Sequence, residues 1–145
     1  MTVLNKKAGF SLLEVMVALA IVAILTMVAL PSYNNYIERS RRGDGMDLLL
    51  NVASAQQAYY LANRTYATAM SNLPTSALSA DRHYIASISS ANATGFILRA
   101  TPSGTGVTGT QASDGSFELR STGRKTWDCG NNGSFSCTWN DASKK

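Results

Sequence analysis

The stretch "NKKAGFSLLEVMVALAIVAILTMVALPSY", residues 5–33, decides how the rest of the chain is arranged. Between Phe10 and Leu30 it contains 21 residues, of which Glu14 alone is charged. An α-helix of this length is about 31 Å long, which matches the roughly 30 Å hydrocarbon core of a bilayer. We therefore predict a membrane-spanning helix over residues 10–30.

The apolar segment does not have the pattern of a cleaved secretory signal. Such a signal has a shorter apolar region, followed by a small-residue cleavage site. Here the segment is followed by Pro31 and then by the polar run Ser-Tyr-Asn-Asn-Tyr. The apolar helix is therefore expected to remain part of the chain.

The carboxylate of Glu14 is an unusual feature of this segment. An ionised carboxylate at the centre of a bilayer costs about 2.5–3.5 kcal/mol on insertion scales, so such a group is normally retained for a partner. The residues Lys6-Lys7-Ala8-Gly9 precede the apolar run, where they resemble a processing site. Cleavage between Gly9 and Phe10 would create an α-amine close to Glu14. The alternative is that Glu14 lies at the lipid headgroups, where the cost is small.

The sequence "KKAGFSLLEVMVALAIVAIL" resembles the type III signal of type IV pilins and pseudopilins. The shared features are the basic leader, the Gly-Phe junction, the glutamate at the fifth position after the junction and the long apolar run. The resemblance implies that a prepilin peptidase cleaves after Gly9 and methylates Phe10. It also implies that Glu14 meets the amine of a neighbouring subunit during filament assembly. A generic single-span anchor, the alternative, leaves Glu14 unexplained.

The distribution of basic residues conflicts with this topology. The leader carries Lys6 and Lys7, whereas Arg39, Arg41 and Arg42 follow the apolar segment. Counting positive residues would therefore place the C-terminal part in the cytoplasm. The leader motif and the cysteines favour the opposite orientation, with the N-terminus cytoplasmic and the C-terminal part periplasmic.

The helix is predicted to continue beyond the apolar segment. Pro31 cannot donate a backbone N–H, so the helix must bend or loosen there without having to end. Apolar residues then recur at spacings of four and three, which predicts an amphipathic helix to about Asn63. Gly43 and Gly45 are its weak points. The apolar stripe comprises Leu48, Val52, Ala55, Tyr59, Ala62 and Tyr66.

The period changes to two after residue 83. The runs "YIASIS", "GFILRAT" and "SFELRS" alternate apolar with polar residues and are separated by turn-rich segments, which predicts antiparallel strands. "SFSCTW" could add an edge strand. The expected fold class is α+β, with a long N-terminal helix packed on an antiparallel sheet of three or four strands. The expected divisions are a leader (1–9), a transmembrane and assembly helix (10–30) and a periplasmic globular domain (31–145).

Two cysteines, Cys129 and Cys137, lie near the C-terminus within the turn-forming sequence "CGNNGSFSC". Their spacing fits neither a CxxC redox pair nor a zinc half-site. A short-loop disulfide is expected if this part lies outside the cytosol. The alternative is a pair of free thiols in a cytosolic protein.

The predicted layout also resembles the pilin fold, and the runs "YYLANRTYATAM" and "FELRSTGRKTW" resemble PilE-type minor pilins. The resemblance implies a subunit of a type IV pilus that functions in pilus biogenesis, twitching motility, adhesion or DNA uptake. Its implied partners are other pilin subunits, the prepilin peptidase, the inner-membrane assembly platform and, before assembly, membrane lipid. After assembly the subunit would be extracellular. The alternatives are a pseudopilin of type II secretion and a major pilin.

The remaining signals predict no further chemistry. The net charge of +4 is scattered, unlike the basic patch of a dedicated nucleic-acid binder. Arg124 and Lys125 would contact phosphate if the filament binds DNA. "GTGVTG" (104–109) matches a dinucleotide-binding pattern but is followed by no helix signal. His83, beside Asp81, is expected at the surface. We expect no catalytic residue, cofactor or metal; an enzyme anchored by one helix is the weaker alternative.

Overall fold

A computed structural model describes residues 9–103 and 114–144, apart from the side chains of residues 28–32, 34 and 35. The chain forms two compact units, residues 1–35 and residues 36–145. Helix α1 (Leu12–Asn63) contributes to both units. The leader residues 1–8 and the segment 104–109 lie outside the described residues, as does the side chain of Pro31.

The first unit contains the first part of α1. Its apolar side chains are exposed between Phe10, at 83%, and Met27, at 78%. Within the described part of the chain, no helix has both the length and the hydropathy needed to cross a membrane. The helix continues through position 31, and the bend predicted at Pro31 stays a prediction.

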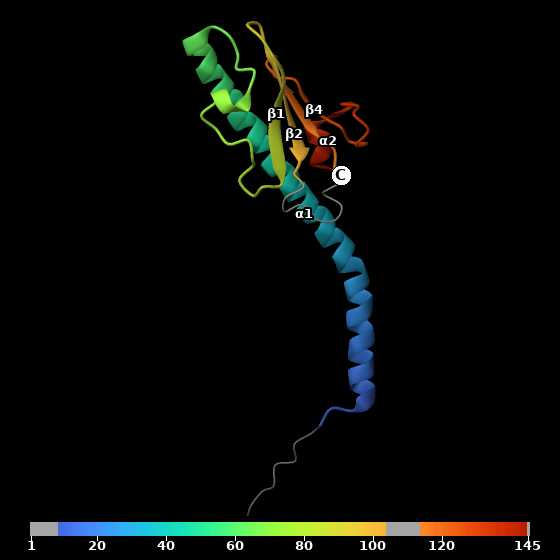
Figure 1. The fold of residues 1–145 in the computed structure, drawn as a ribbon. Coiled ribbons are helices and arrows are strands. Elements are labelled where there is room, and N and C mark those ends of the chain that lie inside the picture. The colour runs from blue at the N-terminus through green and yellow to red at the C-terminus, as the bar shows by residue number, and fades with distance from the viewer. Residues whose placement is uncertain (1–8, 104–113, 145) are drawn as a thin grey trace, which may run out of the picture. The chain divides into compact units, whose positions relative to one another are not determined.

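The second unit combines the rest of α1 with an antiparallel sheet (Figure 1). The sheet strands follow one another in chain order and are β1 (Tyr84–Ala91), β2 (Phe96–Pro102), β3 (Phe117–Arg120), β4 (Lys125–Trp127) and β5 (Cys137–Thr138). A 3-10 turn, η1 (Met70–Asn72), lies between α1 and the sheet, and a short helix, α2 (Trp139–Ala142), follows β5. The α+β class is therefore confirmed.

The sheet differs from the expectation by one strand. Five strands are present among the described residues, because Lys125–Trp127 pairs with β3 through the register Phe117↔Trp127. Gly123, at φ 83°, supplies the left-handed residue of the connecting turn. β5 is the edge strand predicted within "SFSCTW". Three residues are too few for an alternating pattern to be recognised, which explains why β4 was missed.

Alternation along the strands assigns one sheet face to the core. Leu48 and Val52 of the predicted helix stripe are buried, together with Leu49 and Gln56, whereas Ala62 is exposed. The sheet contributes several large side chains to the same core, including Tyr84, Phe96, Leu98, Phe117, Leu119 and Trp127. The amphipathic part of α1 therefore ends at Asn63 as expected, but its buried face is rotated toward Leu49 and Gln56.

Gln56 and Gly45 show how the helix accommodates its neighbours. The Gln56 amide donates to the Ala67 carbonyl and accepts from the Ala67 N–H, both at 2.8 Å, which satisfies a fully buried polar side chain. A Cβ atom on Gly45 would lie 2.7 Å from Cγ of Tyr84. Gly45, predicted as a weak point of the helix, is therefore a position at which the sheet approaches the helix closely.

Candidate functional site

The predicted processing residues lie at the start of α1. Gly9 and Phe10 precede the helix, and Glu14 is the acidic residue of its first turn. The backbone N–H of Glu14 donates to the Ser11 carbonyl at 3.0 Å. Phe10 and Glu14 line one hollow of about 410 Å³, together with Val15, Ala18, Leu19 and Val22. The structure therefore places the predicted new N-terminus and the predicted assembly carboxylate beside one another within one chain.

The outward face of the sheet carries charged side chains in its centre. The β2–β3 register pairs Arg99 with Glu118 and Ile97 with Arg120. Opposite residues of an antiparallel pair lie on the same face, and alternate residues of one strand share a face. Arg99, Glu118 and Arg120 therefore all lie on the face opposite the core.

Glu118 holds both arginines. Its side chain is 2% exposed, whereas those of Arg99 and Arg120 are each 43% exposed. Nε of Arg99 donates to Oε2 of Glu118 at 3.2 Å, and Nε of Arg120 donates to Oε1 at 2.8 Å. A buried carboxylate requires such pairing, and here it orients two half-exposed guanidinium groups.

The disulfide loop contains an aromatic ring that contacts Arg99. Cys129 and Cys137 are bonded, as predicted, with their Cα atoms 5.9 Å apart. Phe135 lies within this loop, and the guanidinium carbon of Arg99 is 4.8 Å from the centre of its ring. A cation over an aromatic face at this distance is attracted by the ring quadrupole. The loop therefore contributes to the position of Arg99.

The shape of the loop is maintained by Asp128, which is 3% exposed. Its carboxylate accepts the N–H groups of Asn132 at 3.1 Å and Gly133 at 2.7 Å. Asn131 and Gly133 both have positive φ, at 47° and 83°. The loop therefore has a defined conformation, maintained by hydrogen bonds as well as by the disulfide.

Two further cations lie in the β3–β4 hairpin. Arg124 and Lys125, which sequence analysis had identified, are exposed, and Nζ of Lys125 lies 5.2 Å from the ring centre of Trp139. A hollow of about 210 Å³ adjoins Arg120 and is lined by Asn92, Thr94 and Ser121, among others. We call Arg99, Arg120, Arg124 and Phe135 the basic surface. Lys125 is not part of it, because Lys125 is opposite the buried Leu119 in the β3–β4 register and therefore lies on the other face of the sheet. Glu118 is the carboxylate that the structure pairs with it.

The chemistry of the basic surface suits a phosphate-bearing ligand. Guanidinium groups bind phosphate oxygens in a fork geometry, and an aromatic side chain adds a stacking partner. Sequence analysis missed Arg99, Arg120 and Phe135. The alternation in "SFELRS" had placed Glu118 and Arg120 on one face, but the strand register that adds Arg99 is not visible in sequence. Of the described residues, one group could hold a metal ion: Asp44, Asp81 and His83.

Comparison with known protein families gives two matches that together cover residues 4–131. Residues 4–30 match the prokaryotic N-terminal methylation motif. Residues 31–131 match the family described as type IV minor pilin ComP, DNA uptake sequence receptor. The second match covers the second half of α1 and most of the sheet.

Individual relatives agree with these matches. The chain is 29% identical over 134 residues to the fimbrial protein EcpC of Eikenella corrodens, covering 86% of this chain and 82% of that protein. It is 43% identical over 53 residues to the type IV major pilin protein PilE1 of Neisseria gonorrhoeae, covering 37% and 32% of the two chains. It is 48% identical over 40 residues to the type IV major fimbrial protein FimA of Dichelobacter nodosus, covering 28% and 25%.

Proposed function

The chain belongs to the ComP family of type IV minor pilins, and from that premise we propose that it is a pilus subunit that binds double-stranded DNA through the basic surface. The family description supplies the ligand class. The observation that carries the proposal is the pair of arginines that Glu118 orients on the outward face of the sheet. The role is structural and ligand-binding, with no catalytic step.

The arginines supply the attraction that DNA binding requires. Contacts to phosphate provide most of the sequence-independent affinity for DNA, and each neutralised phosphate releases counterions. The basic surface contains three cationic side chains, Arg99, Arg120 and Arg124, against one carboxylate, so it attracts a polyanion although the chain as a whole is only modestly basic. Arg99 and Arg120 would fix the position of the duplex on the sheet, because phosphate contacts set register and orientation.

The N-terminal residues support assembly into a filament. Residues 4–30 match the methylation motif, so we infer cleavage after Gly9 and methylation of Phe10 by a prepilin peptidase. Before assembly the apolar helix would hold the subunit in the inner membrane, with the sheet in the periplasm. An assembly platform would then transfer it into the pilus, where Glu14 pairs with the amine of a neighbouring subunit.

Intact-mass analysis of protein from sheared pili tests the processing step. The expected mass lacks residues 1–9 and includes one added methyl group. Removal of Lys6 and Lys7 leaves 13 − 2 = 11 basic and 9 acidic side chains, a formal charge of +2. A chain that still begins at Met1 within assembled pili would contradict this part of the proposal.

DNA binding is tested by fluorescence anisotropy with labelled duplex and the full-length chain in detergent. The double variant Arg99→Ala/Arg120→Ala should bind more weakly, and the slope of log K against log salt should fall by about 1.8, or about 0.9 for each phosphate that is no longer neutralised. The matched control is Arg39→Ala/Arg41→Ala, which removes the same charge from α1. Equal losses of affinity in the two double variants would show that net charge, not the basic surface, governs binding.

A deletion strain tests the biological role. We expect lower DNA uptake with surface pili, twitching and type II secretion preserved, and restoration by the wild-type gene but not by the Arg99→Ala/Arg120→Ala variant. Loss of secretion with normal DNA uptake would instead support a pseudopilin. Loss of all pili would support a major pilin.

A further inference from the structure

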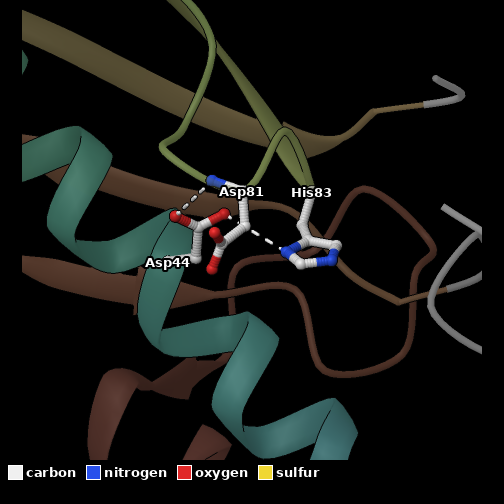
Figure 2. A group of neighbouring side chains, drawn as sticks. All are labelled: Asp44, Asp81 and His83. Atoms are coloured by element: carbon white, nitrogen blue, oxygen red, sulfur yellow. Dashed lines mark hydrogen bonds and ion pairs between the residues drawn. The ribbon is translucent and has the colours of Figure 1, made fainter. Parts of the chain in front are cut away.

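A mixed cluster of metal-ligand side chains lies outside the basic surface (Figure 2). Asp44 projects from α1, and Asp81 and His83 come from the segment that leads into β1. One ligand atom from each side chain can be chosen so that all three lie within 4.8 Å of one another. Residues 37 positions apart in sequence are therefore brought together by the packing of this segment on the helix.

Two atoms of the cluster lack a hydrogen bond although they are buried. Oδ2 of Asp44 and Nδ1 of His83 lie 3.4 Å apart, which is within ion-pair distance, but neither atom makes a hydrogen bond among the described residues. The side chain of Asp44 is only 10% exposed, and that of His83 is 18% exposed. The other carboxylate oxygen of Asp44, Oδ1, accepts the backbone N–H of Asp81 at 3.5 Å. Because buried polar atoms are nearly always hydrogen-bonded, Oδ2 and Nδ1 both have a lone pair or a proton available for a shared partner.

The separation of these atoms fits shared coordination. Two ligand atoms that are each about 2.1 Å from a tetrahedral zinc ion are about 3.4 Å from one another. Asp44 and His83 therefore already have the spacing of two such ligands. Asp81 is exposed, so its carboxylate can turn toward the same point at little cost. Water would complete the coordination.

We propose that Asp44, Asp81 and His83 bind one divalent transition-metal ion, for which zinc is the best fit. An imidazole ligand favours zinc over calcium and magnesium, which prefer sites made only of oxygen. With a neutral imidazole the three side chains carry two negative charges, which a dication balances. Metal binding would link the segment before β1 to α1 at a point where they share one long hydrogen bond to the backbone and the contact between Asp44 and His83.

Zinc titration of the full-length chain in detergent tests the proposal by NMR. His83 is the only histidine of the sequence, so one set of imidazole signals reports on the site. Those signals should shift and saturate at one zinc ion per chain. His83→Gln and Asp81→Asn should weaken zinc binding at least about tenfold in calorimetry, since even the loss of a group that only supports a ligand costs about 10–100-fold. Asp47→Asn, which removes an exposed carboxylate one turn along α1, is the matched control and should bind as the wild type does.

Each other outcome overturns the proposal. Unchanged imidazole signals would leave a direct pair between Asp44 and His83 as the account of the cluster. Equal zinc affinity in His83→Gln and the wild type would place the bound ion elsewhere. Tighter binding of calcium than of zinc would exclude a role for the imidazole as ligand. Asp81 is exposed and its substitution leaves the core intact, so the test does not depend on whether His83→Gln folds.

Discussion

Glu118→Gln tests whether the buried carboxylate holds the basic surface together. The carboxylate accepts two charge-assisted hydrogen bonds, at 3.2 Å from Arg99 and 2.8 Å from Arg120. A glutamine has the same shape but offers one acceptor oxygen. Its NH2 group would face one of the guanidinium N–H groups, so one of the two bonds must be lost.

The expected cost is about 2 kcal/mol of unfolding free energy. A hydrogen bond to a charged group contributes about 1.5–3 kcal/mol, and the lost bond is replaced by an unfavourable approach of two donors. Two effects reduce the total. Both arginine side chains are 43% exposed, so water takes over their released N–H groups. The glutamine also avoids the desolvation of a buried charge, which costs several kcal/mol in the wild type.

Tryptophan fluorescence during thermal unfolding measures this cost. Both tryptophans of the chain, Trp127 and Trp139, are buried in the core, so the signal follows unfolding of the sheet. A loss of about 2 kcal/mol should lower Tm by about 6–8 °C in a chain of this size. Asp47→Asn, the exposed control, should stay within about 0.5 kcal/mol of the wild type. If Glu118→Gln unfolds together with the control, the two arginine pairs do not stabilise the fold.

Three further predictions concern other parts of the chain. Glu14→Ala should be processed normally, but little of it should be found in sheared pili, because removing one partner of a buried ion pair costs about 3–5 kcal/mol. Incorporation at the wild-type level would favour a position of this carboxylate at the lipid headgroups. Gly45→Ala should destabilise the second unit by about 1–2 kcal/mol in the same fluorescence assay, because steric crowding against Tyr84 exceeds the gain of about 1 kcal/mol in helix propensity. A higher Tm than that of the wild type would show that the Tyr84 ring can move. Replacing Cys129 and Cys137 with serine should lower the free energy of unfolding by about 2–3 kcal/mol, and it should weaken duplex binding in the anisotropy assay because Phe135 would no longer hold Arg99 in position. Unchanged DNA affinity would show that the disulfide loop is not part of the basic surface.

The features that depend on neighbouring residues were predictable from sequence. The junction at Gly9 and Phe10, the offset of Glu14 and the apolar run form one continuous motif, and the family match to residues 4–30 agrees with it. The end of α1 near Asn63 and the strands β1, β2 and β3 followed from changes in hydrophobic period. A period is a property of one segment alone, so it needs no knowledge of the fold.

The sequence predicted less precisely which face of α1 is buried in the core. The apolar stripe included Leu48 and Val52, which are buried, but it did not include Gln56, which is fully buried. A glutamine is an unexpected core residue because an unpaired amide would be costly there. Its burial depends on two hydrogen bonds to Ala67, a residue beyond the end of the helix. Those hydrogen bonds exist only once the chain has turned back.

By itself the sequence determined the processing signal, the long helix, the alternating strands and the disulfide, because each is encoded in a short stretch of adjacent residues. The tertiary structure alone decided that Arg99 meets Glu118 and that Asp44 meets His83. The first pair depends on the register of β2 against β3, and a shift of one residue would reverse the face of every side chain. The second depends on how the segment before β1 packs on α1. Both sites therefore depend on contacts between residues that are far apart along the chain. Such contacts leave no periodic pattern in the sequence.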